Sequence, residues 1–252
     1  MAETAAHLVD HVLPHKNIRQ WVLTFPVPIR LCLAVRPKVM ARALEISHLV
    51  TSQYYRKKAG LSAKSSKSGA VTLIQRFGGS LNLNIHFHQL FVDGCYELSD
   101  KNEPIDFWVA APPTVKEIEE VLTKIIQKIT QYLERQKIII KDDNDGGFQI
   151  PIPDEDTLSK LQATSVTYRF ATGKSKGKKA IVLKSVTDTD HSATKGLVAK
   201  NSGFSLHAGV ATKAHERDKL EKICRYIARP AVSEERLSTD DYGNVIYRFK
   251  RG

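Results

Sequence analysis

The sequence predicts a protein of the α+β class, on two observations. Between residues 70 and 98, runs rich in β-branched and aromatic residues follow one another with only short turn signals between them, as in neighbouring strands. Other segments carry apolar residues at helical spacing, most clearly residues 114–133. Runs of strands combined with separate helices are typical of α+β folds.

The elements of the first half follow from periodicity and from residues that break it. In chain order we predict a strand over 18–26, a helix from Pro37 to Gly60, strands over 70–79 and 81–92, and a hairpin at Asp93-Gly94 leading into 95–98. Thr114 and Glu117 form a capping box that predicts the start of the helix over 114–133.

The second half begins with an acidic, loop-like segment. We interpret residues at about 141–157 as a linker or insertion within a single domain that spans 1–252. Beyond it we predict a β-hairpin over 166–186 with a lysine-rich tip and a strand over 203–211. The last predicted helix runs from about Thr212 to Ala228, before Pro230.

Composition restricts the function classes. The 252 residues include 38 Lys and Arg against 27 Asp and Glu, a formal net charge of +11 that favours polyanionic partners, nucleic acid first. No apolar run approaches the ~20 residues that cross a bilayer, and the N-terminal segment does not resemble a signal peptide. Three separated cysteines exclude a Cys-based zinc module within the chain. We therefore expect a cytoplasmic protein with no membrane partner.

His86 and His88 lie two residues apart in an apolar strand, so both point to one face, about 6.6 Å apart at the backbone. Two imidazoles at that spacing can bind one metal ion. With nine histidines, this spacing arises by chance in about one chain in three, so the motif alone is weak. Its setting strengthens it, because Asn82 and Asn84 share that face while apolar residues occupy the other. Partly exposed structural histidines remain the alternative.

Two imidazoles are too few for a metal site, so a further ligand must come from elsewhere. His207 is the best candidate third ligand, because it lies mid-strand between apolar neighbours, although a buried structural histidine is an equal alternative. His7, His11 and His15 form a rival cluster at helical spacing, but Pro14 breaks that helix before His15.

Tyr226 lies on the basic face of the last predicted helix. Leu220, Ile223, Cys224 and Ile227 form its core stripe, while Lys222, Arg225 and Arg229 share the spacing of Tyr226. A phenol is a weak nucleophile at neutral pH, and nearby positive charge favours the phenolate and holds a polyanionic substrate. A tyrosine packed beside solvated arginines is the alternative, and Tyr54 and Tyr55 are rival nucleophiles.

Four segments of the chain, in this order and at this spacing, form a specific combination. They are "RQWVLTFP", "GAVTLIQRFGGSLNLNIHFHQLFVDG", "GFSLHA" and "ICRYIARPAVSEERLS". Together they resemble the rolling-circle transposases of bacterial insertion sequences. These enzymes belong to the HUH nuclease superfamily, named for His-hydrophobic-His, and act on mobile genetic elements through DNA recombination. The resemblance extends over nearly the whole chain. Compared with that family, we expect the chain to lack an N-terminal zinc module and to be truncated at its C-terminus.

The resemblance implies a five-stranded antiparallel sheet flanked by helices, a ferredoxin-like or RRM-like core with the HUH strand near its centre. It implies that His86 and His88 bind a divalent metal, Mg²⁺ or Mn²⁺, and that Tyr226 is the nucleophile. Tyr226 would attack single-stranded DNA at the element ends and form a 5′-phosphotyrosine. It also implies a bacterial, nucleoid-associated protein.

Basic residues in two places are the predicted DNA contacts. They are Lys222, Arg225 and Arg229 on the last helix, and Lys174, Lys176, Lys178 and Lys179 at the hairpin tip. Lysine clusters in solvated loops are the usual alternative. A second hypothesis is a catalytically incomplete DNA-binding remnant of a transposase. A third, a metal hydrolase using the two histidines, needs carboxylate ligands on their face, and Asp93 has the wrong strand parity.

Overall fold

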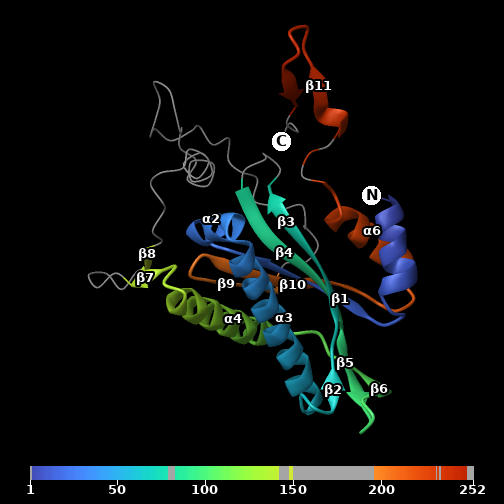
Figure 1. The fold of residues 1–252 in the computed structure, drawn as a ribbon. Helices are drawn as coiled ribbons and strands as arrows, with labels where there is room; N and C mark the ends of the chain where they lie inside the picture. The colour runs from blue at the N-terminus through green and yellow to red at the C-terminus, as the bar shows by residue number, and fades with distance from the viewer. Residues whose placement is uncertain are drawn as a thin grey trace.

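A five-stranded antiparallel sheet forms the centre of the computed structural model, in the strand order β3-β4-β1-β10-β9 (Figure 1). The structure describes residues 2–78, 83–141, 148–149, 196–230, 232 and 234–248. The strands are β1 (Ile18–Thr24), β3 (Ala70–Phe77), β4 (Leu83–Val92), β9 (Val198–Asn201) and β10 (Phe204–Thr212). The predicted α+β class is confirmed, with the His86 strand, β4, between β3 and β1.

Two groups of helices pack on opposite faces of this sheet. The first comprises α2 (Val27–Val35), α3 (Pro37–Ala59) and α4 (Val115–Arg135). The second comprises α1 (Ala2–His7), a π-helical turn η1 (Leu8–Val12) and α6 (Arg217–Ile227), and Figure 1 shows α6 beside the N-terminal helix, away from α3 and α4. We call these the α3/α4 face and the α6 face.

Smaller elements extend from the central sheet. A three-stranded sheet contains β2 (Ser66–Lys67), β5 (Gly94–Leu98) and β6 (Pro104–Val109). Two further pairs are β7 (Ile140–Lys141) with β8 (Phe148–Gln149), and β11 (Leu237–Thr239) with β12 (Val245–Tyr247), the latter after a 3₁₀ turn η2 (Glu234–Arg236). None of the helices in the described ranges is long and apolar enough to span a bilayer.

Alternation along β4 divides its side chains between the two faces. Leu83, Ile85, Phe87 and Phe91 belong to the large core under α2, α3 and α4, as the parity of the sequence predicts. Leu90 and Val92 point the other way and pack in a second cluster with the stripe of α6. His86 and His88 have the parity of this second set, so they lie on the α6 face.

Local signals fix the long helices of the α3/α4 face. In α4 the Thr114 hydroxyl accepts from Glu117 N, and Glu117 Oε2 accepts from Thr114 N at 2.7 Å, so the predicted capping box is formed. Helix α3 starts at Pro37 and is capped after Ala59 by Gly60, whose φ of 70° is a left-handed conformation that glycine adopts without steric cost. Both predictions are confirmed.

The predicted hairpin at Asp93-Gly94 is wrong, because β4 and β5 do not pair with each other. After one bend at Asp93 the chain leaves the central sheet, and β5 pairs with β2 and β6. Glycine is required at position 94 by close approach, since a Cβ there would lie 2.0 Å from the Trp108 carbonyl oxygen. The Asp-Gly pair therefore marks a change of sheet and not a tight turn.

The predicted start of the last helix is also wrong. Thr212 is the last residue of β10, paired with Ile18, and α6 begins only at Arg217. Between them, Glu216 Oε2 accepts from Lys213 N at 2.7 Å and closes a turn. The lysine-rich hairpin over 166–186 and most of the segment at 141–157 lie outside the described residues.

Candidate functional site

Two rows of side chains cross the α6 face of the sheet at the histidine pair. In one row His86 lies opposite Gln75 on β3 and Thr24 on β1. In the other row His88 lies opposite Leu73 on β3 and Val22 on β1. The imidazole centroids are 4.9 Å apart, and both histidines are buried. Strand pairing therefore places the two imidazoles together on the face that the sequence parity predicts, His86 between polar partners and His88 between apolar ones.

A backbone carbonyl fixes the tautomer of His86. Its Nδ1 lies 2.6 Å from the Asn84 carbonyl oxygen. Because a carbonyl only accepts hydrogen bonds, Nδ1 carries the proton, and the neutral ring has its lone pair on Nε2. A backbone carbonyl bonded to one ring nitrogen is the usual support of a histidine that binds a metal through the other.

His88 is held by a side chain instead. Gln20 on β1 is 3% exposed, and its Nε2 lies 2.7 Å from His88 Nδ1. The two residues are diagonal neighbours, since Gln20 pairs with Leu90 while His88 pairs with Val22. Gln20 is not among the site residues that the sequence motifs predict. Its one signal in the sequence is a polar residue within the apolar strand "IRQWVLTFP".

Tyr226 is brought to the same face by α6. Its ring is edge-on to that of His88, with centroids 6.5 Å apart. The stripe of α6 packs as predicted, with Leu220, Cys224 and Ile227 buried and Ile223 partly buried. The helix end is tied to the sheet by Gln75, which donates through Nε2 to the Ile227 carbonyl at 3.0 Å. Tyr226 and the two histidines thus form one group, built from a strand and a helix far apart in sequence.

Cations lie near Tyr226 at the end of α6, where its half-buried ring packs against the cluster of the α6 face. The Arg229 guanidinium carbon lies 4.9 Å from the centroid of the Tyr226 ring, a cation–π contact. Lys222 and Arg225 are exposed on the same helix, and Arg225 pairs with Glu221. Burial raises the pKa of the Cys224 thiol to about 11, so this neighbour is protonated at neutral pH and is no competing nucleophile.

His207 shares the face but not the immediate group. It pairs with Val22, whose other partner is His88, so β1 separates the two histidines. Two strand spacings correspond to about 9–10 Å between their backbones. Within the described ranges, no group of three or more His, Cys, Asp or Glu side chains is arranged to hold a metal ion. The role of His207 as a third ligand stays a prediction.

The histidine pair nevertheless fits a divalent ion in its donor chemistry. Two imidazoles converge on one face, and the lone pair of His86 is directed by its bond to Asn84. Mg²⁺ and Mn²⁺ prefer oxygen ligands, so water or a phosphate oxygen would complete their coordination. Asp93 supplies none, because it lies on the α3/α4 face, where it accepts from the Tyr55 hydroxyl of α3.

The rival tyrosines lie on the α3/α4 face. Tyr55 is fully buried, and burial, with the nearby Asp93 carboxylate, raises its pKa well above the usual range. Burial also raises the pKa of Tyr54, whose hydroxyl accepts from Lys58 at 3.0 Å. Neither phenol is activated for attack.

Other predicted sites are not joined to this group. The rings of His7 and His11 are 5.3 Å apart, but His7 precedes the π-helical turn η1 and His11 lies within it, in the N-terminal segment. Lys174, Lys176, Lys178 and Lys179 lie outside the described residues.

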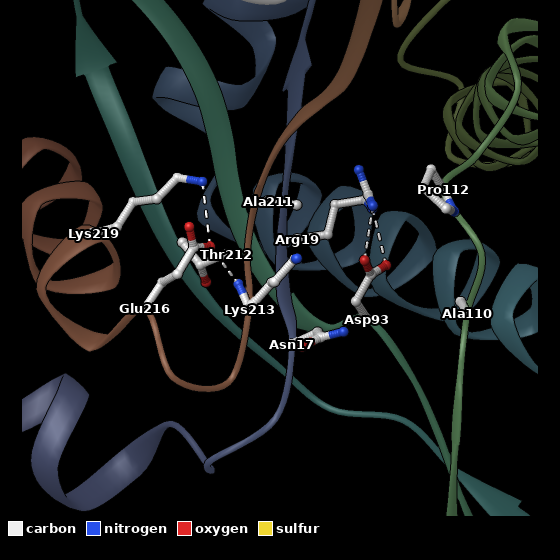
Figure 2. A pocket seen from close by; sticks show the side chains of 10 residues that line it. All are labelled: Asn17, Arg19, Asp93, Ala110, Pro112, Ala211, Thr212, Lys213, Glu216 and Lys219. Carbon is white, nitrogen blue, oxygen red and sulfur yellow. Dashed lines mark hydrogen bonds and ion pairs between the residues drawn. The ribbon is translucent and has the colours of Figure 1, made fainter.

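A separate pocket of about 310 Å³ lies at the other end of β1 and β4 (Figure 2). Figure 2 shows the Arg19 guanidinium facing the Asp93 carboxylate, with Nε–Oδ1 and Nη2–Oδ2 distances of 2.9 and 2.8 Å. Asp93 follows His88 by five residues, about 16 Å along an extended chain. None of the predicted site residues lines this pocket, and the opposite charges of Arg19 and Asp93 within it are paired with each other.

A family model described as "Putative transposase" matches residues 69–252, which include His86, His88, His207 and Tyr226. No curated protein and no solved structure matches the chain.

Proposed function

The chain belongs to this transposase family, and from that premise we propose that it is an HUH-type, rolling-circle transposase that cuts single-stranded DNA with Tyr226 and a divalent metal ion. The family carries DNA transposition as its function, which makes the chain a DNA-processing protein. The proposal adds three things to the family's function: Tyr226 as the nucleophile, a divalent metal ion, and single-stranded DNA as the substrate.

The observation that carries this proposal is the placement of Tyr226 against His88. Their ring centroids are 6.5 Å apart, and His86 lies 4.9 Å from His88 by the same measure. A hydroxyl nucleophile and two metal-ligand types on one face are the parts that a tyrosine-dependent strand cleavage needs. On opposite faces of the sheet they would not support this chemistry.

In the proposed reaction the Tyr226 Oη attacks the phosphorus of a phosphodiester. The Oη–P bond forms as the P–O3′ bond breaks, leaving a 5′-phosphotyrosine and a 3′ oxygen that takes a proton to become a 3′-OH. The phenol proton passes to water. Arg229 over the ring and the exposed Lys222 and Arg225 attract the DNA phosphates and favour the phenolate.

His86 and His88 would hold the metal ion, Mg²⁺ or Mn²⁺. When bound, the ion supplies Lewis-acid polarisation of the scissile phosphate. The Nδ1 bond of His86 to Asn84 keeps its ring in one orientation. Water or DNA oxygens would complete the coordination, with or without His207.

Covalent trapping tests the proposal. The protein is incubated with single-stranded DNA carrying an element-end sequence and Mn²⁺, and adducts are separated on a denaturing gel. We expect an adduct with the wild type and none with Tyr226→Phe. Tyr242→Phe is the matched control, because Tyr242 is 91% exposed, on the loop between β11 and β12, and its loss should leave the adduct intact.

Two outcomes contradict the proposal in different ways. An adduct that persists in Tyr226→Phe removes the nucleophile assignment. DNA binding by the wild type with no adduct under any metal favours the DNA-binding remnant, for which the net charge of +11 is sufficient.

A further inference from the structure

The tautomers of the two site histidines are controlled by groups of different kinds. His86 bonds through Nδ1 to a backbone carbonyl, which cannot change from acceptor to donor. His88 bonds through Nδ1 to the side-chain amide of Gln20, which carries both a donor and an acceptor. The proton position on His86 is therefore fixed, whereas that on His88 depends on which end of the Gln20 amide faces it.

The orientation in the structure favours the tautomer that does not bind metal through Nε2. With the Gln20 NH₂ group against Nδ1, that nitrogen accepts, and the proton of the neutral ring lies on Nε2. If the amide rotates by half a turn, its oxygen faces Nδ1, the proton moves to Nδ1 and the lone pair to Nε2. The amide has nearly the same shape in both orientations, so the rotation requires no new space.

We propose that Gln20 is a positioning residue that selects the tautomer of His88 and inverts its amide when His88 takes up a divalent ion. The proposal rests on the proposed function, because it assumes that the ion binds at the histidine pair. The contact of Gln20 is with the His88 ring, through which it would act on the metal site.

The position of Gln20 on β1 places its side-chain amide beside His88. This residue is 3% exposed and its pairing partner on β4 is Leu90, so His88 is its diagonal neighbour, within reach of a long side chain. The pairing of β1 with β10 shifts register between Gln20 and Val22, an irregularity of the kind that redirects side chains near active sites. The side-chain amide of Gln20 therefore reaches His88 while the backbone of β1 stays paired with β4.

Nitrogen NMR of ¹⁵N-histidine-labelled protein reads the tautomer directly, with no enzymatic turnover. We expect the neutral His88 ring to carry its proton on Nε2 in metal-free wild type. In Gln20→Glu only oxygens face Nδ1, so we expect the proton on Nδ1 without metal. His88→Ala identifies the resonances.

Metal affinity is the second readout, measured by titration with Mn²⁺ alone. Gln20→Met keeps the length of the side chain but neither hydrogen bond, and we expect Mn²⁺ binding to weaken roughly 10–100-fold. Gln20→Glu, whose carboxylate can accept from Nδ1 of His88, should bind Mn²⁺ more tightly than Gln20→Met does. Gln89→Met is the matched control, because Gln89 is a buried glutamine of the same sheet whose amide bonds Ser47 on the α3/α4 face.

The outcomes separate this inference from the proposed function. If metal-free His88 already carries its proton on Nδ1, or if Gln20→Met binds Mn²⁺ like the wild type, Gln20 has no positioning role while the metal site stands. If the wild type and His88→Ala bind Mn²⁺ equally, the metal site itself is wrong, and the Gln20 inference falls with it.

Discussion

On the α3/α4 face of the central sheet, polar side chains are paired with one another inside the core. Arg19 and Asp93 form a buried ion pair, and the Tyr55 hydroxyl bridges them to Trp21. On the α6 face, His86, His88 and Gln20 are equally buried, but their neighbour is Tyr226, on a helix whose outer side is cationic. Strands β1 and β4 thus supply polar side chains to both faces, because alternate residues of a strand point to opposite sides of the sheet.

The difference between the faces indicates what each polar group is for. Removing one partner of a buried ion pair destabilises the fold, because the other charge is left buried without compensation. Imidazoles whose rings are oriented by Asn84 and Gln20, beside a phenol, have the composition of a reactive site. We therefore expect substitutions on the first face to change stability and those on the second to change chemistry.

The largest effect on stability is expected from Asp93→Ala. It leaves the buried Arg19 without its partner, which lowers the free energy of unfolding by about 3–5 kcal/mol in urea denaturation. Asp106→Ala, on exposed β6, is the control and should have little effect. A small loss of stability accompanied by loss of the DNA adduct would contradict the division between the faces.

Metal binding should stabilise the protein through the α6 face. At a Mn²⁺ concentration of 100 times the dissociation constant, the free energy of unfolding should rise by about 2.7 kcal/mol, and EDTA should remove the increase. His88→Ala should abolish the increase. His48→Ala should retain it, because His48 stacks on Phe91 on the other face. An increase that survives in His88→Ala would place the ion elsewhere.

A smaller effect is expected at the start of α4. Thr114→Ala removes the hydroxyl that caps the helix and should lower the free energy of unfolding by about 1 kcal/mol. Adduct formation by the folded protein should not change, because α4 covers the opposite face. Thr123→Ala, exposed in the middle of the same helix, should not destabilise it.

The smallest effect is expected from Lys222→Ala on the exposed side of α6. Removing one phosphate contact should reduce the slope of log affinity against log salt by about 0.7 for single-stranded DNA. Stability should change by less than about 0.5 kcal/mol. Lys124→Ala on α4 changes the net charge equally on the other helix group. An equal loss of slope in both variants would mean that DNA binding depends on net charge alone.

Much of the site follows from the sequence because its signals are local. Strand parity assigned His86 and His88 to one face and Phe87 to the core, and helical spacing assigned Cys224 to the core and Tyr226 to another side of α6. The capping box of Thr114 is equally local. Each depends only on residues a few positions apart, whose relative directions are set by the period of the strand or helix.

Two local predictions failed where distant pairing decided the outcome. Asp93-Gly94 has the composition of a hairpin turn, but Arg19 binds Asp93 and the β6 backbone approaches Gly94, so the chain changes sheet. Thr212 continues β10 because Ile18 pairs with it. Pairing with strands that are distant in sequence therefore outweighs the local conformational preferences of these residues.

The sequence by itself determined the α+β class, the histidine face, the basic helix around Tyr226 and the resemblance to transposases. Only the tertiary structure decided that β1 lies between β4 and β10, which separates His207 from His88 and brings Gln20 beside it. It also decided that α6 crosses to the histidine face, so that Tyr226 meets His88. The physical reason is that periodicity fixes where a side chain points, whereas strand order and register fix what it meets, and these depend on pairing across the whole chain.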